Sequence, residues 1–314
     1  SFVVVEDTWL ALQAISAWHR RQFQYPVIGI TGSNGKTIVK EWCSQILSGY
    51  LSVVKSPKSY NSQTGVPLSV WRMHEDADIA VIEAGISQPG EMQKLADIIK
   101  PDIGIFTGLG EAHQENFRDY AHKLQEKWHL FANASCLVFS VDHPELRKRV
   151  GEIAADVTLC TWTEEEHDAK WKLSYEILTD TSRIFLCSED REFCFEIPFT
   201  NVISVHNAVN AFLAALEAGV PGKYLLEKMP HLSPVAMRME VLKGMNQCTL
   251  INDSYNSDPS SVRIAIDFTI SQNESGIVLI LSDILQTGVP DKLLYRQIAE
   301  LIEEKNIDML IGIG

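Results

Sequence analysis

Residues 29–37 read Gly29-Ile30-Thr31-Gly32-Ser33-Asn34-Gly35-Lys36-Thr37. They join a short apolar run, residues 26–30, to a segment with helical patterning, so a strand, a glycine loop and a helix start meet at one lysine. In such an arrangement the backbone N–H groups of the loop and the positive end of the helix dipole surround a polyphosphate. The stretch therefore predicts a phosphate-binding loop.

The residue types in this loop suit that task. Gly32 and Gly35 let the backbone approach the phosphates, while Lys36 can reach the β- and γ-phosphates as a catalytic cation. The Thr37 hydroxyl can bind the accompanying Mg²⁺. We expect the nucleotide to contact the whole loop: Gly32, Ser33, Asn34, Gly35, Lys36 and Thr37. The spacing is GxxGKT, because the longer GxxxxGK[ST] form would need a glycine where this chain has Ile30. A chance glycine turn is the competing interpretation, and the flanking segments favour nucleotide binding.

Composition excludes several classes of function. The chain has 314 residues, of which 46% are hydrophobic and 22% charged, as in an ordinary globular protein. The net charge of -14 argues against a nucleic-acid or anionic membrane surface, since those partners need clustered Lys and Arg. The sequence has no long apolar run, no signal-peptide pattern and no CxxC cysteine pair. We therefore expect a cytoplasmic protein with reduced cysteines and no membrane partner.

Short apolar runs alternate with helical segments in the first half of the chain, which favours an α/β fold with a mostly parallel sheet covered on both faces. The expected strands are 27–30, 51–54, 79–84, 103–107 and 137–140. The expected helices are 9–23, 39–47, 65–73, 91–99 and 120–131. Phe2–Val5 also reads as a strand.

The pattern changes twice further along. Between residues 157 and 199, runs at 171–178, 183–187 and 193–197 indicate a small antiparallel subregion, followed by a helix at 205–217. A hinge-like stretch, residues 230–234, precedes renewed strand–helix alternation, with strands at 249–252, 278–281 and 309–312. We expect a connecting segment at 1–24, a central P-loop domain at 25–234, and a truncated Rossmann-like α/β domain at 235–314.

Polar side chains follow several of the predicted strands, where an open α/β sheet places its ligands. Glu83 ends one strand and can serve as a Mg²⁺ ligand, although a solvated strand-end carboxylate is an equal alternative. His113 follows a glycine-flanked turn, where a structural role is more common. Lys127 lies on the next helix, and the pattern alone favours an exposed lysine paired with Glu126.

Two later segments are also rich in polar side chains. His206, Asn207 and Asn210 share a helix, where they can either cap the helix start or read an adenine edge. Further on, a strand ends in Asn252-Asp253-Ser254-Tyr255-Asn256-Ser257-Asp258-Pro259. We expect Asp258 to cap the following helix and Pro259 to be its first residue.

Taken together, six segments in order along the chain resemble the Mur ligases, and most closely the MurF branch of that family. The segments are GITGSNGKT, YNSQTGVPLSVW, IEAGISQPGEM, GEAHQENF, HNAVNA and INDSYNSDP. Six linked motifs are far more specific than a phosphate-binding loop alone. The resemblance implies an ATP-dependent ligase that joins D-alanyl-D-alanine to UDP-N-acetylmuramoyl-tripeptide through an acyl phosphate. The resemblance implies three domains, of which the N-terminal one is missing from this sequence, residues 25–234 form the ATPase domain and residues 235–314 form part of the third. Some family members carry a fused alanine racemase domain, and this chain is similar to those fusion proteins.

The resemblance also implies roles for individual residues. Thr37, Glu83 and His113 match metal ligands that hold two Mg²⁺ ions, and His113 is placed among the catalytic residues. Lys127 lies fourteen residues after His113, the spacing at which the family has a catalytic, carbamylated lysine. A partly desolvated, neutral lysine takes up CO₂, and the carbamate supplies the oxygen ligands that Mg²⁺ prefers.

The remaining matches concern the nucleotide base and the substrates. Asn207 and Asn210 resemble adenine-side residues, and Arg238 and Asp253 resemble residues that contact phosphate and ribose. The expected substrate-facing residues are Asn61, Ser62, Gln63, Tyr255 and Asn256. The chain departs from many relatives at Ile38, where they have a second threonine, and at residues 62–64 and 286–287, which leaves details of substrate contact open.

The sequence also allows rival functions. Another Mur-type or folylpolyglutamate-type ligase would share the ATP site and differ in its acceptor. A P-loop GTPase would need a guanine-reading NKxD motif, which we do not find in the sequence. A nucleotide-binding fragment without ligase activity would bind ATP and never ligate.

Overall fold

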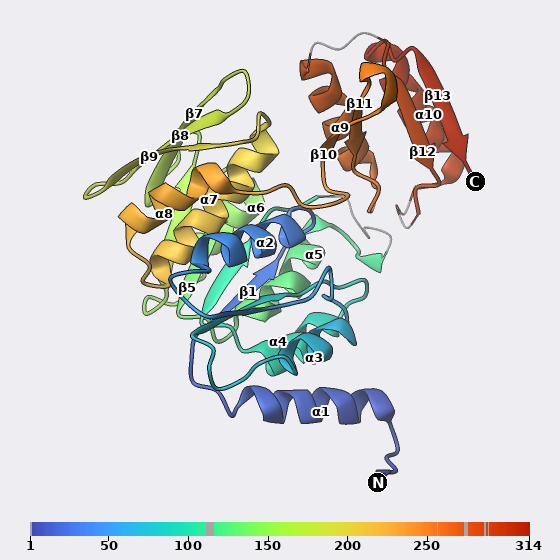
Figure 1. The fold of residues 1–314 in the computed structure, drawn as a ribbon. Coiled ribbons are helices and arrows are strands. Elements are labelled where there is room, and N and C mark those ends of the chain that lie inside the picture. Colours follow the sequence, from blue (N-terminus) through green and yellow to red (C-terminus); the bar gives the residue numbers. More distant parts are fainter. Residues whose placement is uncertain (1, 111–115, 256, 273–275, 286, 288) are drawn as a thin grey trace. The chain divides into compact units, whose positions relative to one another are not determined.

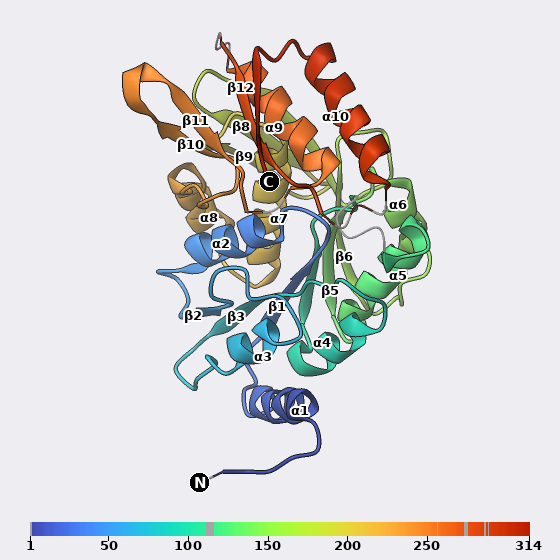
Figure 2. The ribbon, with the colours of Figure 1, turned by 90° about the vertical axis from the view of Figure 1, so that its right-hand side faces the viewer.

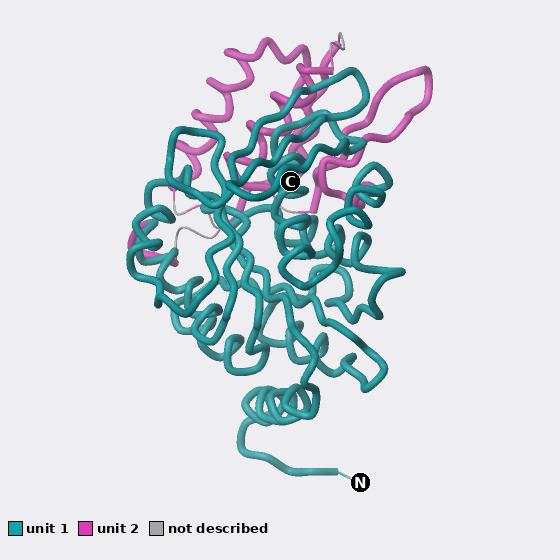
Figure 3. Tube along the Cα trace, turned by 90° about the vertical axis from the view of Figure 1, so that its left-hand side faces the viewer, with its two compact units in different colours: residues 1–109, 120–233 teal, residues 110–119, 234–314 magenta. Residues whose placement is uncertain are grey.

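Strands between residues 27 and 197 form a sheet in which an inner strand, β1 (Val27–Thr31), is buried along its whole length. The computed structural model describes residues 2–110, 116–255, 257–272, 276–285, 287 and 289–314. They divide into two compact units, one of residues 1–109 and 120–233 and the other of residues 110–119 and 234–314 (Figure 3).

The first unit contains a nine-stranded sheet in the order β2-β3-β1-β4-β5-β6-β7-β8-β9 (Figures 1 and 2). The other strands are β2 (Val53–Lys55), β3 (Ile79–Glu83), β4 (Ile103–Phe106), β5 (Cys136–Ser140), β6 (Thr158–Thr163), β7 (Trp171–Ile177), β8 (Ser182–Cys187) and β9 (Glu192–Ile197). Pairs from β2 to β7 are parallel, and β7, β8 and β9 pair antiparallel. The expected fold class, a mostly parallel sheet with a small antiparallel part, is confirmed.

Helices cover both faces of this sheet, as continuous apolar strands require. They are α1 (Thr8–Arg20), α2 (Lys36–Leu47), α3 (Gly65–Val70), α4 (Glu91–Ile99), α5 (Tyr120–Trp128), α6 (Pro144–Val150), α7 (Val202–Glu217) and α8 (Gly222–Lys228), with 3₁₀ turns at His129–Phe131 and Met229–His231. Helices α2, α7 and α8 pack together on one face, whereas α1, α3 and α4 pack on the other (Figure 2). None of the described helices is long and apolar enough to cross a membrane.

The strand order sets the position of the site. The connection after β1 leads to β2 on one side of the sheet, whereas the connection after its neighbour β4 leads to β5 on the other side. Ligands of open α/β sheets bind at such a switch point, outside the carboxyl ends of the strands. The glycine loop after β1 and the polar ends of β3 and β4 all lie at this edge.

The N-terminal segment differs from the expectation. Phe2–Val5 is not a strand in the structure and lies exposed, so that prediction is wrong. An apolar run gains strand stability only from a neighbour that pairs with it, and no described strand does so here. Helix α1 begins at Thr8 because the Asp7 carboxylate accepts hydrogen bonds from the N–H groups of Trp9 and Leu10 at 2.8 and 2.9 Å.

The second unit contains two small two-stranded sheets and two helices. The antiparallel pair is β10 (Glu240–Lys243) with β11 (Thr249–Asn252), and the parallel pair is β12 (Val278–Ser282) with β13 (Met309–Ile313). The helices are α9 (Pro259–Ser271) and α10 (Asp291–Glu304), and a 3₁₀ turn spans Met245–Gln247. As expected, Asp258 caps α9 and Pro259 is its first residue.

Candidate functional site

The glycine loop after β1 is held in place by the end of β4. The N–H of Ser33 donates to the carbonyl of Gly108 at 2.8 Å, and the Thr107 hydroxyl donates to the carbonyl of Asn34 at 2.5 Å. In both contacts a residue at the end of β4, Gly108 or Thr107, holds a backbone group of the loop in place. Its remaining amides are therefore presented at the N-terminus of α2, which is the geometry of an anion site.

Gly35 is the N-cap of α2 and has a left-handed backbone, with φ of +83°. A Cβ at this position would lie 2.4 Å from Oδ1 of Asn207, a buried residue of α7. Only glycine meets both conditions without strain. The loop is therefore packed directly against the helix that carries the predicted adenine-side amides.

Two lysines converge on the same carbonyl of the loop. The ammonium of Lys36 donates to the carbonyls of Gly32 and Ser33 at 3.0 and 2.8 Å. Lys127, on α5, donates to the carbonyl of Gly32 at 3.0 Å. The structure thus brings together two of the predicted catalytic residues, which are far apart in sequence.

Lys127 is buried, with 3% of its surface exposed, so the interpretation of an exposed lysine paired with Glu126 is wrong. Burial holds its pKa well below the usual value, and the nearby charges of Lys36 and Lys123 act in the same direction. A lysine with a lowered pKa is more often neutral near pH 7. Neutral amine is the form that reacts with CO₂, so Lys127 fits the expected carbamylation.

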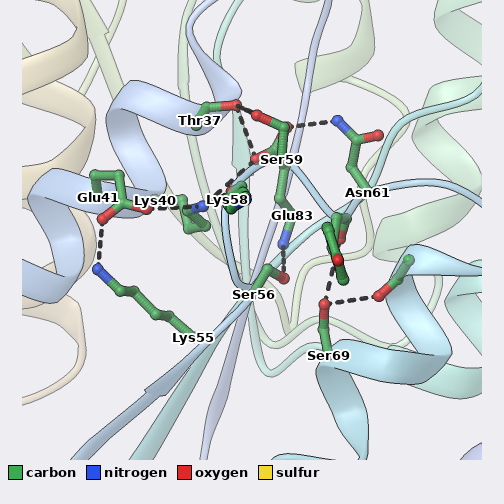
Figure 4. A network of polar contacts seen from close by, with 12 residues as sticks. Thr37, Lys40, Glu41, Lys55, Ser56, Lys58, Ser59, Asn61, Ser69 and Glu83 are labelled. Atoms are coloured by element: carbon green, nitrogen blue, oxygen red, sulfur yellow. Dashed lines mark hydrogen bonds and ion pairs between the residues drawn. The ribbon is translucent and has the colours of Figure 1, made fainter. Parts of the chain in front are cut away.

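The predicted Mg²⁺ ligands Thr37 and Glu83 are in contact (Figure 4). The Thr37 hydroxyl lies 3.1 and 3.0 Å from the two carboxylate oxygens of Glu83. The amide of Asn61 donates to Glu83 Oε1 at 2.6 Å, and the Glu83 side chain has 1% of its surface exposed. The alternative of a solvated strand-end carboxylate is therefore wrong. The Thr37 hydroxyl, at the start of α2, and the Glu83 carboxylate, at the end of β3, are the hard oxygen donors that Mg²⁺ prefers, so these residues fit the ion.

The polar residues of α7 are not helix caps. The helix begins at Val202, with Asn201 as its cap, so His206, Asn207 and Asn210 lie inside it. Asn210 accepts a hydrogen bond from the indole of Trp162 at 2.9 Å. The amide nitrogens of Asn207 and Asn210 are buried and have no hydrogen-bond partner among the described residues. Buried donors of this kind are expected to meet a ligand or water.

A cavity of about 340 Å³ in the first unit is lined by two neighbours of these amides: Trp162, which donates to Asn210, and His206, which precedes Asn207. Its lining includes Thr107 and Gly108 from the end of β4, and Trp162, Glu164 and His206. His206 Nε2 contacts the Glu164 carboxylate, and both residues line the cavity. Because Thr107 and Gly108 also hold the glycine loop, the cavity opens beside the predicted phosphate site.

The expected substrate-facing loop is tied into the fold. Ser62 accepts a hydrogen bond from the N–H of Gly65 at 3.2 Å. The amide of Gln63 donates to the carbonyl of Glu91 at 3.1 Å and accepts from Gln13 at 3.0 Å. These side chains position the loop between α1, α3 and α4, and the amide of Asn61 faces Glu83.

Three predicted residues lie together in the second unit. The guanidinium of Arg238 lies 4.0 Å from the ring centroid of Tyr255, and Asp253 accepts a hydrogen bond from the N–H of Met239 at 3.1 Å. Burial raises the pKa of Asp253 to about 6, against the opposing effects of Met239 and Arg238. His113 and Asn256, also predicted as site residues, lie outside the described residues.

Sequence reasoning missed Lys40 and Ser59, which belong to the same polar cluster (Figure 4). Ser59 lies 3.2 Å from the Thr37 hydroxyl, and Lys40 lies 4.0 Å from Glu83. One signal was available for Lys40: it lies beside Val39 and Cys43 on the apolar, buried side of α2. A lysine on the core side of a helix is rare unless it is paired.

Fold and site together define a P-loop nucleotide-binding protein of the α/β class. Residues 30–218 match the family model for the Mur ligase middle domain. The chain belongs to the Mur ligase family.

Two curated relatives illustrate this similarity. The chain is 27% identical to the UDP-N-acetylmuramoyl-tripeptide--D-alanyl-D-alanine ligase of Bacillus subtilis over 316 aligned residues, covering 99% of this chain and 68% of that protein. It is 25% identical to the enzyme of the same name from Escherichia coli, covering 99% of this chain and 70% of that protein.

Solved structures have the same fold. MurF from Acinetobacter baumannii has a TM-score of 0.86 at 22% identity, covering 99% of this chain and 69% of that one. MurF from Thermotoga maritima, solved in complex with ADP, has a TM-score of 0.85 at 21% identity, covering 99% of this chain and 71% of that one.

Proposed function

We propose that this protein is an ATP-dependent ligase that joins D-alanyl-D-alanine to UDP-N-acetylmuramoyl-tripeptide. The observation that carries the proposal is the convergence of the P-loop, the Thr37–Glu83 pair and the buried Lys127 at one edge of the sheet. The choice of substrates rests on the names of the relatives, which align with nearly the whole chain.

In this proposal, a carboxylate oxygen of the tripeptide attacks the γ-phosphorus of ATP, and ADP leaves. The acyl phosphate that results has the leaving group that a free carboxylate lacks. The amine of D-alanyl-D-alanine then attacks the acyl carbon, phosphate departs, and the amine loses a proton to give the amide. Lys36 and the amides of the loop neutralise phosphate charge during transfer, which is the main requirement of phosphoryl transfer.

Thr37 and Glu83 are proposed to hold Mg²⁺, with His113 and a carbamate on Lys127 as further ligands for a second ion. Bound Mg²⁺ would supply charge neutralisation at the phosphates. The direct support is the Thr37–Glu83 contact and the lowered pKa of Lys127. Carbamylation would convert a buried amine into an oxygen ligand.

The base of ATP is proposed to lie near Asn207 and Asn210. Their buried amide nitrogens and the adjoining cavity support this assignment. Contacts of Arg238 and Asp253 with phosphate and ribose, and of Tyr255 with substrate, stay predictions. A fused racemase domain and a cytoplasmic location also stay predictions.

The test is ADP release by the natural protein that contains this chain, with each substrate omitted in turn. We expect release only when both UDP-N-acetylmuramoyl-tripeptide and D-alanyl-D-alanine are present, together with a product of the summed mass less water. Release that ignores the dipeptide but needs another amino acid would indicate another ligase of this fold, such as the folylpolyglutamate type. ATP binding without turnover would refute ligase activity.

A further inference from the structure

Lys40 is a fully buried lysine on α2, one helical turn after Lys36. Its ammonium lies 2.9 Å from Glu41 Oε1 and 4.0 Å from Glu83 Oε2, and it donates a hydrogen bond to the carbonyl of Lys58 (Figure 4). Burying an ammonium is costly unless its charge and hydrogen bonds are compensated. Among the residues that the structure describes, Glu41, Glu83 and the carbonyl of Lys58 supply this compensation for Lys40, so the position of the ammonium is tightly specified.

Four charged groups form the cluster, and their charges cancel. Glu41 pairs with Lys40 and also with Lys55, whose side chain is 38% exposed. Glu83 is within ion-pair distance of Lys40 and of no other cation among the described residues. Lys40 therefore links an outer pair, which solvent reaches, to the buried carboxylate at the end of β3.

Lys40 also fixes the segment that faces Glu83. Lys58, whose carbonyl accepts the hydrogen bond from Lys40, has a left-handed backbone with φ of +47°, which is strained for a residue with a side chain. The next residue, Ser59, contacts the Thr37 hydroxyl at 3.2 Å, and Asn61 donates to Glu83 at 2.6 Å. The ammonium thus compensates for a strained turn whose neighbours contact Thr37 and Glu83.

We propose that Lys40 is a positioning residue, which holds Glu83 and the segment 56–61 in the arrangement that receives the metal–nucleotide complex. This inference rests on the proposed function, in which Thr37 and Glu83 bind Mg²⁺ with ATP. Lys40 acts through Glu83 and Lys58 and touches neither substrate. Its contribution is to orientation, because Glu83 Oε2 faces the ammonium while Oε1 accepts from Asn61.

The test compares Lys40→Met with Lys55→Met in the full natural protein. Both changes remove an ammonium that pairs with Glu41, but only Lys40 also approaches Glu83. Calorimetric titration measures the Kd of ATP twice, once with Mg²⁺ and once with EDTA. We expect K40M to weaken binding with Mg²⁺ by tenfold or more and binding in EDTA by less than threefold. K55M is expected to change both values by less than threefold.

A purely packing role for Lys40 predicts a different result. K40M would then weaken both titrations equally or neither, and that outcome overturns the proposal. If the unchanged protein binds no ATP at all, the proposed function fails instead, so the two failures are distinguishable.

If K40M is too unstable for calorimetry, a second measurement tests the same proposal. Denaturant unfolding of K40M, E83Q and K40M/E83Q gives the coupling between the two side chains. We expect the unfolding equilibrium constant of the double variant to be at least tenfold smaller than that of K40M, because the double variant no longer contains an uncompensated buried carboxylate. A double variant no more stable than K40M overturns the proposal.

Discussion

Replacing Gly35 with alanine tests the packing of the phosphate-binding loop. Gly35 combines a left-handed φ of +83° with a Cβ position only 2.4 Å from Asn207 Oδ1. Gly90 offers a matched control, since it is also a helix N-cap with a φ of +78° but has nothing within 4 Å of its Cβ position. Both substitutions place an alanine in a strained backbone conformation, but only the one at Gly35 brings a Cβ into collision with Asn207.

The magnitudes follow from these two terms. An alanine in a left-handed backbone conformation lowers stability by about 1–2 kcal/mol, and this loss applies to both variants. Overpacking a buried contact costs about 1–3 kcal/mol more, and only Gly35→Ala incurs it. The expected destabilisation is therefore about 1–2 kcal/mol for G90A and about 2–5 kcal/mol for G35A, because Asn207 is buried and cannot swing into solvent.

Denaturant unfolding followed by tryptophan fluorescence measures these values in the first unit, because all 7 tryptophans of the chain lie in it. Introducing G35A into an Asn207→Ala background isolates the collision. There the cost of G35A should fall to that of G90A. Equal costs for G35A and G90A in the unchanged protein would refute the reasoning, since the collision would then have no energetic effect.

Three further predictions concern charged groups. The pKa of Lys127 is lower in the folded protein than in the unfolded chain, so between these two pKa values the unfolded chain binds more protons. The stability of the protein should therefore rise with pH from the folded-state pKa up to about 10.5. Lys127→Met should abolish that slope in CO₂-free unfolding titrations, and should abolish any carbamate signal from ¹³C-bicarbonate in NMR spectra. The raised pKa of Asp253, about 6 against 3.8, means that the folded state keeps the proton to higher pH. Stability should therefore fall as pH rises between these two values, by at most about 3 kcal/mol. Asp253→Asn should remove this fall in unfolding titrations followed by circular dichroism, which also reports on the second unit, where the chain has no tryptophan. Glu83→Gln should weaken Mg²⁺-dependent ATP binding by tenfold or more in calorimetry and leave binding in EDTA within threefold; an equal loss in both would contradict a role as metal ligand.

Most of the sheet was predictable because its strands are continuous apolar runs between clear turn signals. Residues 79–83 and 103–106 are buried along their whole length, and such runs identify central parallel strands whatever their neighbours are. Phe2–Val5 is equally apolar but pairs with no described strand and lies exposed. Whether a run finds a strand to pair with depends on the tertiary structure, which the run itself does not reveal. The helix α7 was expected to start at residue 205, whereas it starts at Val202 with Asn201 as its cap. The start was missed because the polar residues His206 and Asn207 resemble capping residues in the sequence.

The site was predictable where its chemistry is local and not where it depends on distant packing. The order of glycines, Lys36 and Thr37 indicates phosphate binding by itself. The burial of Lys127 and the contact of Asn207 with the loop depend on where α5 and α7 pack, which no short pattern specifies. Lys40 was missed for the same reason, because its partners lie on separate segments.

The central claim is that ATP activates a substrate carboxylate as an acyl phosphate. The most direct test supplies the natural protein with ATP, D-alanyl-D-alanine and UDP-N-acetylmuramoyl-tripeptide labelled with ¹⁸O in the reacting carboxyl group, and measures the released phosphate by mass spectrometry. Attack of the carboxylate on the γ-phosphate predicts that each phosphate carries one labelled oxygen. Phosphate without label, formed together with ADP, would show that water attacks ATP and would contradict the account.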